Sequence, residues 1–245
     1  MIDYPLLSAL LAPLLLPLAV YTRTVTPKLP EPEGARSGRI GNHPKGSEEG
    51  ALSLMVLGDS AAAGVGVAHQ SQALSGQLVS GLSENILIEW HLEAESGLRS
   101  AQVLERLEKM TPFKVDVVVV SLGVNDVTGG VSAKNWIRNL VQIRAILVEA
   151  FSAQQVIFSS VPPMGAFPAL PQPLRWYLGK KAALFNQHLR ALAQTQHDLC
   201  YLGVDFPTGA EYIASDGFHP SHVAYAHWSR LVVHEIENGY FARAE

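Results

Sequence analysis

The sequence contains a single cysteine, Cys200, among its 245 residues. One thiol supports neither a framework of disulfides nor a zinc site built on several thiolates. Nine histidines are present, but none belongs to a His-Glu-x-x-His arrangement of the kind that binds catalytic zinc. We therefore expect no metal and no other cofactor.

Charged residues are also scarce, at 16% of the chain, against about 25% in an ordinary soluble domain. Residues 1–20 contain only one of the 40 charged residues, Asp3, but the other 225 residues still have only 39, about 17%. The deficit therefore lies mainly in the body of the protein. The net charge is −4 and the chain has no basic run. This balance argues against nucleic acid as a partner.

The segment Tyr4–Val20 is nearly all apolar and contains three prolines. It has neither the basic start nor the small-residue cleavage site of a signal peptide, so a secreted or periplasmic location is disfavoured. Two alternatives stay open: a membrane anchor, which normally needs about 20 residues, and a helix docked on the protein's own surface. The cations that follow, beginning with Arg23, would leave the body of an anchored protein in the cytoplasm. We expect a cytoplasmic protein, with or without membrane contact.

Residues 21–50 have the composition of a linker, with four prolines and five glycines and no periodic apolar pattern. We expect one folded domain over residues 51–245. Within it, short apolar β-type segments alternate with longer stretches of helical spacing. The predicted strands are Leu52–Leu57, Ile86–Leu92, Val115–Leu122, Val156–Ser160 and Tyr201–Val204. The predicted helices are Leu74–Leu82, Ala101–Met110, Trp136–Ala150, Ala182–Thr195 and Val223–Glu237.

Strands that are apolar on both faces and separated by helices indicate a parallel sheet covered on both sides. The fold class is therefore α/β: a three-layer α/β/α sandwich around a mostly parallel, five-stranded sheet. In such a sheet the ligand site lies beyond the carboxyl ends of the strands.

Polar residues and glycine follow the predicted strands at this edge. Ser60 comes after the first strand, Gly97 after the second and Asn125 after the third. Asp216 and His219 follow the fifth strand after a loop. A serine, a histidine, an aspartate and hydrogen-bond donors are the components that acyl transfer requires.

Each of these residue types has a task in that chemistry. A serine hydroxyl such as that of Ser60 needs a base to remove its proton, and His219 supplies one. Asp216 can hold the imidazole and stabilise its cation. The negative oxygen formed on an attacked ester needs donors, for which we identify the Asn125 amide and the backbone N–H groups of Gly97 and Ser60.

At these positions the sequence resembles the SGNH (GDSL-type) hydrolases, from Leu52 to about Trp228. The blocks that carry the resemblance are Gly58-Asp59-Ser60, Gly97, Gly123-Val124-Asn125-Asp126 and Asp216-Gly217-Phe218-His219. The family comprises esterases, lipases, thioesterases and carbohydrate deacetylases on a flavodoxin-like sandwich. The resemblance implies that Ser60 is the nucleophile, that Asp216 and His219 complete a triad, and that Gly97 and Asn125 form the oxyanion hole. The sequence departs from the family name at Ala61, where leucine is expected.

A nucleotide- or phosphate-binding module is the competing hypothesis, because Gly58–Gly66 is rich in glycine after a strand. The stretch lacks the third glycine of a dinucleotide-binding motif, and no lysine-serine pair follows it. This hypothesis would also leave Asp216 and His219 without a role.

The segment 161–173 is rich in proline and unusually apolar for a loop. Because it follows a strand's carboxyl end, we expect Met164, Phe167 and Leu170 to bind the apolar part of a substrate. The alternative is a loop packed under the N-terminal segment. The sequence thus predicts a serine esterase for small esters with short to medium acyl or aryl groups. Acetyl sugars, thioesters, aryl esters and lysophospholipids all remain open as the natural substrate.

Overall fold

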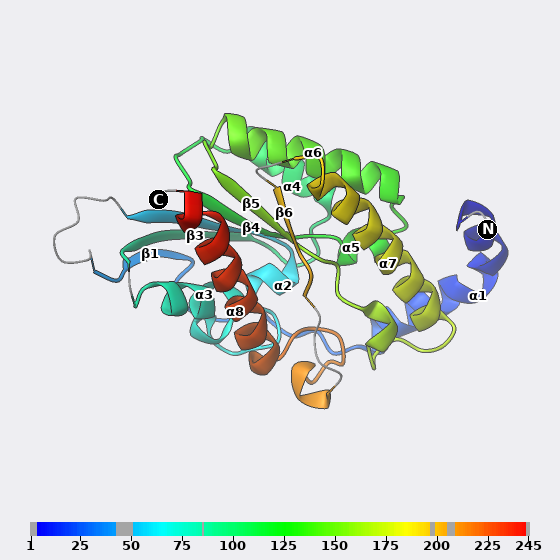
Figure 1. Cartoon of the computed structure of the whole chain (residues 1–245). Helices are drawn as coiled ribbons and strands as arrows, with labels where there is room; N and C mark the ends of the chain where they lie inside the picture. The colour runs from blue at the N-terminus through cyan, green and yellow to red at the C-terminus, as the bar shows by residue number, and fades with distance from the viewer. Residues whose placement is uncertain (1–3, 43–50, 85, 197–198, 205–208, 244–245) are drawn as a thin grey trace.

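A sheet runs through the centre of the computed structural model, which describes residues 4–42, 51–84, 86–196, 199–204 and 209–243 (Figure 1). Six strands are present in this described part, in the spatial order β1-β3-β2-β4-β5-β6. The strands are β1 (Ser37–Ile40), β2 (Leu52–Gly58), β3 (Ile88–Ala94), β4 (Val117–Ser121), β5 (Gln155–Ser159) and β6 (Leu199–Leu202). All neighbouring pairs are parallel except β1 with β3. The predicted α/β class with a mostly parallel sheet is confirmed.

The number of strands was predicted wrongly, because β1 lies inside the segment interpreted as a linker. Its four residues are all exposed and show no alternation of apolar and polar side chains. The strand joins the sheet through antiparallel pairing with β3, from Ser37 opposite His91 to Ile40 opposite Ile88. Edge pairing of this kind depends on backbone groups, so it leaves little signal in the side-chain pattern.

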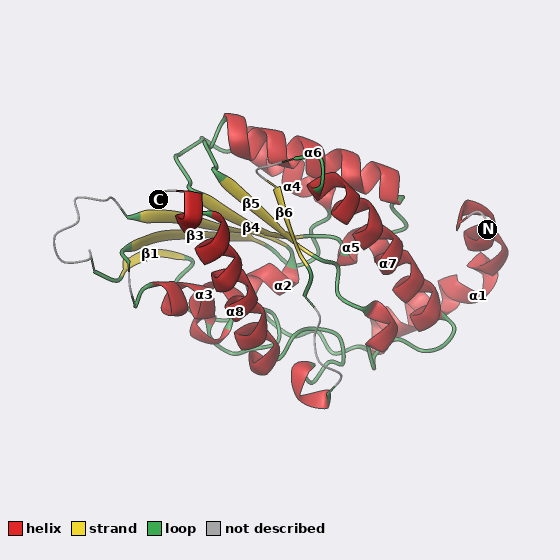
Figure 2. Ribbon diagram, in the orientation of Figure 1, coloured by secondary structure: helices red, strands yellow, loops and turns green. Residues whose placement is uncertain are grey.

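Helices cover both faces of the sheet (Figure 2). Valines of β4 alternate between the two: Val118 and Val120 belong to one apolar cluster, Val117 and Val119 to the other. The first face is covered by α4 (Ser100–Lys109), α6 (Ala133–Glu149) and α7 (Leu174–Ala193), and the second by α3 (Leu74–Leu82) and α8 (His222–Gly239). This confirms the three-layer sandwich.

The remaining helical elements are short, except for the N-terminal helix. They are α1 (Tyr4–Val25), α2 (Ser60–Ala63), α5 (Val124–Thr128), η1 (Gln70–Gln72), η2 (Met164–Ala166), η3 (Ala210–Tyr212) and η4 (Phe241–Arg243). Helix α7 begins earlier than predicted, at Leu174 rather than Ala182. Its first two turns contain Gly179 and follow a proline-rich stretch, which obscured the helical periodicity.

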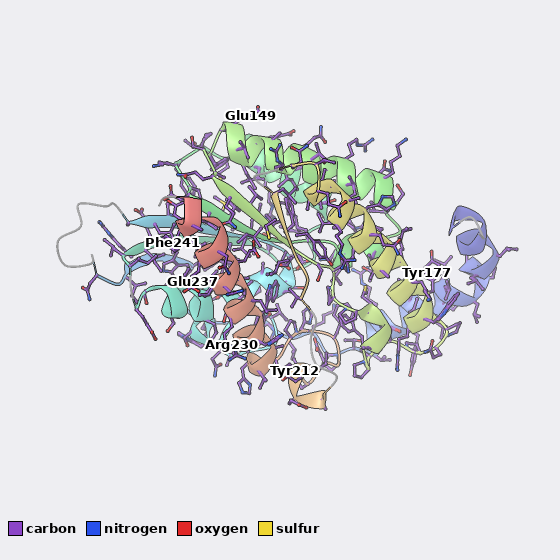
Figure 3. The ribbon with its side chains drawn as sticks, viewed as in Figure 1. Glu149, Tyr177, Tyr212, Arg230, Glu237 and Phe241 are labelled. Atoms are coloured by element: carbon purple, nitrogen blue, oxygen red, sulfur yellow. The ribbon has the colours of Figure 1, made fainter. Side chains whose placement is uncertain are left out.

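Helix α1 packs against α7, the helix that carries Tyr177 (Figure 3). Leu15 and Thr22 are buried, and Leu11 and Leu18 are partly buried in the same core cluster. Several large apolar side chains of α1 remain exposed: Leu10, Leu14, Leu16, Val20, Tyr21 and Val25. Among the described residues, no helix is both long enough and apolar enough to span a membrane. Contact with a membrane surface stays a prediction.

Candidate active site

The turn between β2 and α2 presents Ser60 at the carboxyl end of the central strand β2. Asp59 caps the short helix, because its Oδ1 accepts a hydrogen bond from the backbone N–H of Ala61 at 3.1 Å. Gly58 is required before it: a Cβ on this residue would lie 2.3 Å from the carbonyl oxygen of Ser121 on β4. The turn therefore passes close to β4 and directs the serine toward the strand ends.

Ser60, His219 and Asp216 form one hydrogen-bonded line. Ser60 Oγ lies 2.9 Å from His219 Nε2. On the other side of the imidazole ring, His219 Nδ1 lies 2.6 Å from Asp216 Oδ2. These are the contacts by which a base takes a proton from a hydroxyl while a carboxylate orients the base. The structure thus brings Ser60 next to His219, which lies 159 residues further along the chain and carries Asp216 beside it.

Asp216 is held as a carboxylate by its surroundings. Its side chain is fully buried, and burial alone would raise its pKa. Hydrogen bonds from the His219 ring and from the backbone N–H groups of His219 and Phe218 act in the opposite direction. Together they lower the pKa of Asp216 below its ordinary value. A group that remains ionised suits the stabilisation of an imidazolium.

A short helix and a loop bring hydrogen-bond donors toward the serine turn. Asn125 lies in α5 after β4, and its Nδ2 donates to the carbonyl of Leu98 at 3.0 Å and lies 3.4 Å from Asp59 Oδ2. Gly97 lies in the loop after β3 with φ of +88°, a conformation that favours glycine. No atom lies within 4 Å of the place where its Cβ would be. The contact with Leu98 therefore joins the Asn125 helix to the loop that contains Gly97.

A buried polar network connects α5 to the neighbouring helices and holds it in place. Asp126 accepts hydrogen bonds from the backbone N–H of Ser100 at 3.0 Å and from its hydroxyl at 2.6 Å. Asn139 donates to the same hydroxyl at 2.9 Å. Lys181 donates to the carbonyl of Val127 at 3.0 Å, and burial lowers its pKa to about 8. Helices α4, α6 and α7 are thereby all connected to the short helix that contains Asn125.

Asp59 lies beside both the nucleophile turn and Asn125. Burial raises the pKa of this carboxyl to about 7, even though the N–H of Ala61 and the nearby His219 act to lower it. A protonated Asp59 would add no negative charge next to the place where an ester oxyanion forms. This raised pKa was not predictable from the residue pattern, because it results from burial in the folded protein.

A clamp from the predicted linker holds the Gly97 loop. Glu31 Oε1 accepts hydrogen bonds from the backbone N–H of Ser96 at 2.7 Å and from its hydroxyl at 2.8 Å. Arg36 pairs with Glu31 at 3.2 Å and donates to the carbonyl of Ala94. These residues were missed by the sequence analysis, since a charged pair within a Pro/Gly-rich stretch resembles ordinary surface.

An apolar cavity of about 50 Å³ opens beside Ser60 and His219. Phe167 lines it, as predicted, and makes an edge-to-face contact with Phe218 at 5.0 Å between ring centroids. Tyr212, on η3 near the start of α8, is also part of the wall (Figure 3). Further apolar lining residues are Leu122, Val124, Val161, Val204, Ile213 and Trp228, of which only Val161 belongs to the predicted wall segment.

Met164 and Leu170, predicted to bind substrate, do not line this cavity. Both side chains are buried in the apolar core next to α7. Met164 begins the η2 turn, whose packing against α7 directs this side chain inward. The prediction for these two residues is therefore corrected: they support the wall and are not part of it.

No group of three or more His, Cys, Asp or Glu side chains is placed to hold a metal ion within the described ranges. Cys200 is a free thiol whose pKa is raised by burial.

A known protein family matches most of this chain. The model of the GDSL-like lipase/acylhydrolase family matches residues 56–227. The GDSL-like esterase Rv1075c of Mycobacterium tuberculosis is 30% identical over 193 residues, which cover 71% of this chain and 58% of that protein. The chain therefore spans somewhat more than half the length of this relative.

Two solved structures show the same fold at low sequence identity. A member of the lipolytic G-D-S-L family from Veillonella parvula aligns with a TM-score of 0.59 at 15% identity, over 77% of this chain and 97% of that one. The aryl esterase of M. smegmatis aligns with a TM-score of 0.57 at 14% identity, over 77% and 100% of the two chains. Because the family model matches residues 56–227, which are most of this chain, the chain belongs to the GDSL-like lipase/acylhydrolase family.

Proposed function

We propose that this protein is a serine esterase that hydrolyses carboxylic esters with short acyl groups through an acyl-enzyme. The observation that carries the proposal is the line from Ser60 through His219 to Asp216, with contacts of 2.9 and 2.6 Å, at the mouth of an apolar cavity. Membership in the ester-hydrolase family and the likeness to an aryl esterase support the same class of reaction.

In the first half of the reaction, Ser60 Oγ attacks the ester carbonyl carbon while its proton passes to His219 Nε2. Asp216 stabilises the imidazolium that forms. The tetrahedral intermediate collapses when its carbon–oxygen bond to the alcohol breaks and His219 returns the proton to the leaving oxygen. In the second half, water attacks the acylated Ser60 with the same base, and the acid is released.

The developing oxyanion needs donors that are already in place. Asn125 Nδ2 carries two hydrogens, of which one is used in the 3.0 Å bond to Leu98. The second has only a long contact of 3.4 Å with Asp59, so an oxyanion can compete for it. The N–H of Gly97 and that of Ser60 complete the proposed donor set.

The acyl preference follows from the size of the cavity. A cavity of about 150 Å³ holds a benzene molecule, whereas the one beside Ser60 measures about 50 Å³. Space of this size suits an acetyl group or an acyl chain only slightly longer. We therefore favour the short end of the range that the sequence left open.

The experiment compares hydrolysis of 4-nitrophenyl acetate by the wild-type protein and by the Ser60→Ala variant. Ser60→Ala should remove turnover and leave the thermal unfolding curve unchanged. Ser80→Ala, a matched change on the exposed surface of α3, should retain wild-type activity. Substantial turnover by Ser60→Ala would exclude the proposed nucleophile. The cytoplasmic location expected from the sequence stays a prediction, which fractionation of cells expressing the full chain would test.

A further inference from the structure

A second hollow adjoins the catalytic cavity. It measures about 530 Å³, roughly tenfold the volume of the cavity beside Ser60. The two share the wall formed by Ser160, Val161, Pro162 and Val204. The other side of this hollow, hereafter the α7 groove, consists of η2 and of residues on one side of α7.

The α7 groove lies in a strongly basic part of the chain. From Ala150 to Gln196 the sequence contains no aspartate or glutamate, although the net charge of the whole chain is −4. Helix α7 alone carries four cations: Arg175, Lys180, Lys181 and Arg190. The local charge of this segment is therefore positive in a chain whose net charge is negative, a distribution that favours anions over cations as ligands there.

Two of these cations, Lys180 and Arg190, line the groove, and no described lining residue is acidic. Arg190 donates a hydrogen bond to the hydroxyl of Tyr201 at 3.0 Å, and its guanidinium lies 4.6 Å from the centre of that ring. These contacts hold the guanidinium at the groove wall and leave other N–H groups for a ligand. Lys180 has no hydrogen-bond or ion-pair partner within the described part of the chain.

The lining also contains an exposed aromatic side chain. Trp176 on α7 has 45% of its surface exposed, which is unusual for so large an apolar group. An indole face at a groove wall can pack against the ring or the carbon skeleton of a ligand. The groove therefore combines apolar contact with two positive charges.

We infer that the α7 groove binds the alcohol half of the substrate, and that this half carries an anionic group, a carboxylate or a phosphate, which Lys180 and Arg190 recognise. The inference rests on the proposed function, because it assigns the two halves of one ester to two adjacent hollows. The ester bond must lie at Ser60, and the small cavity there accommodates the short acyl group. The alcohol half then extends past the shared wall at Val161 into the larger hollow.

The experiment uses aryl acetates that differ only in the leaving group: phenyl acetate, 4-acetoxybenzoate and 4-acetoxyphenyl phosphate. The quantity of interest is the ratio of kcat/KM for each anionic ester to kcat/KM for phenyl acetate. Each exposed charge pair contributes a severalfold effect at most. Lys180→Gln should therefore lower the ratio about threefold, and Lys180→Gln combined with Arg190→Gln about tenfold, through KM.

Charge reversal distinguishes electrostatics from altered packing. Lys180→Glu should lower the ratio further than Lys180→Gln, and added salt should reduce the wild-type ratio toward that of the double variant. Lys134→Gln serves as the matched control, since it removes an exposed cation of α6 outside the groove, and should leave the ratio unchanged. A larger fall for the phosphate than for the carboxylate would identify phosphate as the preferred anion, and equal falls would support recognition of both.

The inference is overturned if wild-type protein hydrolyses phenyl acetate while none of the groove variants changes the ratio. It is also overturned if monophenyl succinate, which carries its anion on the acyl half, shows the same dependence on Lys180. If wild-type protein hydrolyses none of these esters, the proposed esterase function fails instead. The two failures are therefore distinguishable.

Discussion

Glu31 and Ser96 lie 65 residues apart in the sequence, yet one carboxylate oxygen of Glu31 accepts both the backbone N–H and the hydroxyl hydrogen of Ser96. Ser96 directly precedes Gly97, whose N–H is a proposed oxyanion donor. Glu31 precedes β1 in the chain, within the segment whose composition predicts a linker, and its contacts with Ser96 hold the loop that contains Gly97. Oxyanion stabilisation requires donors fixed in advance, because their energetic advantage depends on avoiding reorganisation during the reaction.

Removal of this clamp should therefore reduce turnover. Glu31→Ala deletes a charged acceptor of two hydrogen bonds, each worth about 1.5–3 kcal/mol. Only part of this lost hydrogen-bond energy raises the activation free energy of the reaction. We therefore expect kcat to fall about tenfold with KM nearly unchanged. Steady-state kinetics on 4-nitrophenyl acetate provides the measurement. Glu108→Ala, an exposed position on α4, is the control, and an unchanged kcat for Glu31→Ala would contradict the positioning role.

Asn125→Ala should have a larger effect, because it removes a proposed donor to the oxyanion itself. Loss of one such donor costs about 10²–10³ in kcat. The thermal unfolding temperature should fall only slightly, since α5 keeps the contacts of Asp126 and Lys181. The matched change Asn135→Ala, on the exposed side of α6, should leave kcat as it is. A kcat within severalfold of wild type for Asn125→Ala would remove this residue from the oxyanion site.

Asp216→Asn preserves the size of the side chain but removes its charge. In a serine–histidine–aspartate arrangement this change lowers kcat about 10⁴-fold, because the imidazole adopts the wrong tautomer and its cation loses a partner. We expect a loss of this size in single-turnover acylation as well as in steady state. Acylation at the wild-type rate would show that Asp216 does not orient His219.

Asp59 should make stability depend on pH in a particular direction. Its pKa of about 7 in the folded protein lies above the ordinary value of 3.8, so the folded state holds this proton more tightly than the unfolded chain. The stabilisation is complete below the unfolded value and is lost as the pH rises through 7. The difference between these two pKa values corresponds to about 4 kcal/mol.

The Asp59→Asn variant cannot ionise and should lack this contribution. Urea unfolding of both proteins between about pH 4 and about pH 8 measures the difference. The free energy of unfolding of the wild type should decrease relative to that of Asp59→Asn across this window. Two parallel curves would mean that Asp59 titrates normally in the folded state.

The fold was largely predictable because the buried strands have a simple pattern. Val117 to Val120 are apolar on both faces, as a doubly covered parallel strand requires. The edge strand β1 was not predictable, since its residues are exposed and its pairing with β3 uses backbone groups. The early start of α7 at Leu174 was hidden by a glycine and by the prolines before it.

The catalytic residues of the site were predictable because the chemistry requires particular residue types, and each of them follows a predicted strand. Ser60, Asn125, Asp216 and His219 each follow a strand, and the structure places them at one sheet edge. The residues that line the cavity were harder to predict from the sequence. Whether Phe167 rather than Met164 lines the cavity depends on the turn geometry of η2, which composition does not encode.

The central claim is that Ser60 becomes acylated during turnover. The most direct measurement is mass spectrometry of the protein quenched within milliseconds of mixing with 4-nitrophenyl acetate. The account predicts a mass increase of one acetyl group, located on the peptide that contains Ser60 and absent from Ser60→Ala. Rapid turnover of the ester without this adduct, or with an acetyl group on another residue that persists in Ser60→Ala, would contradict it.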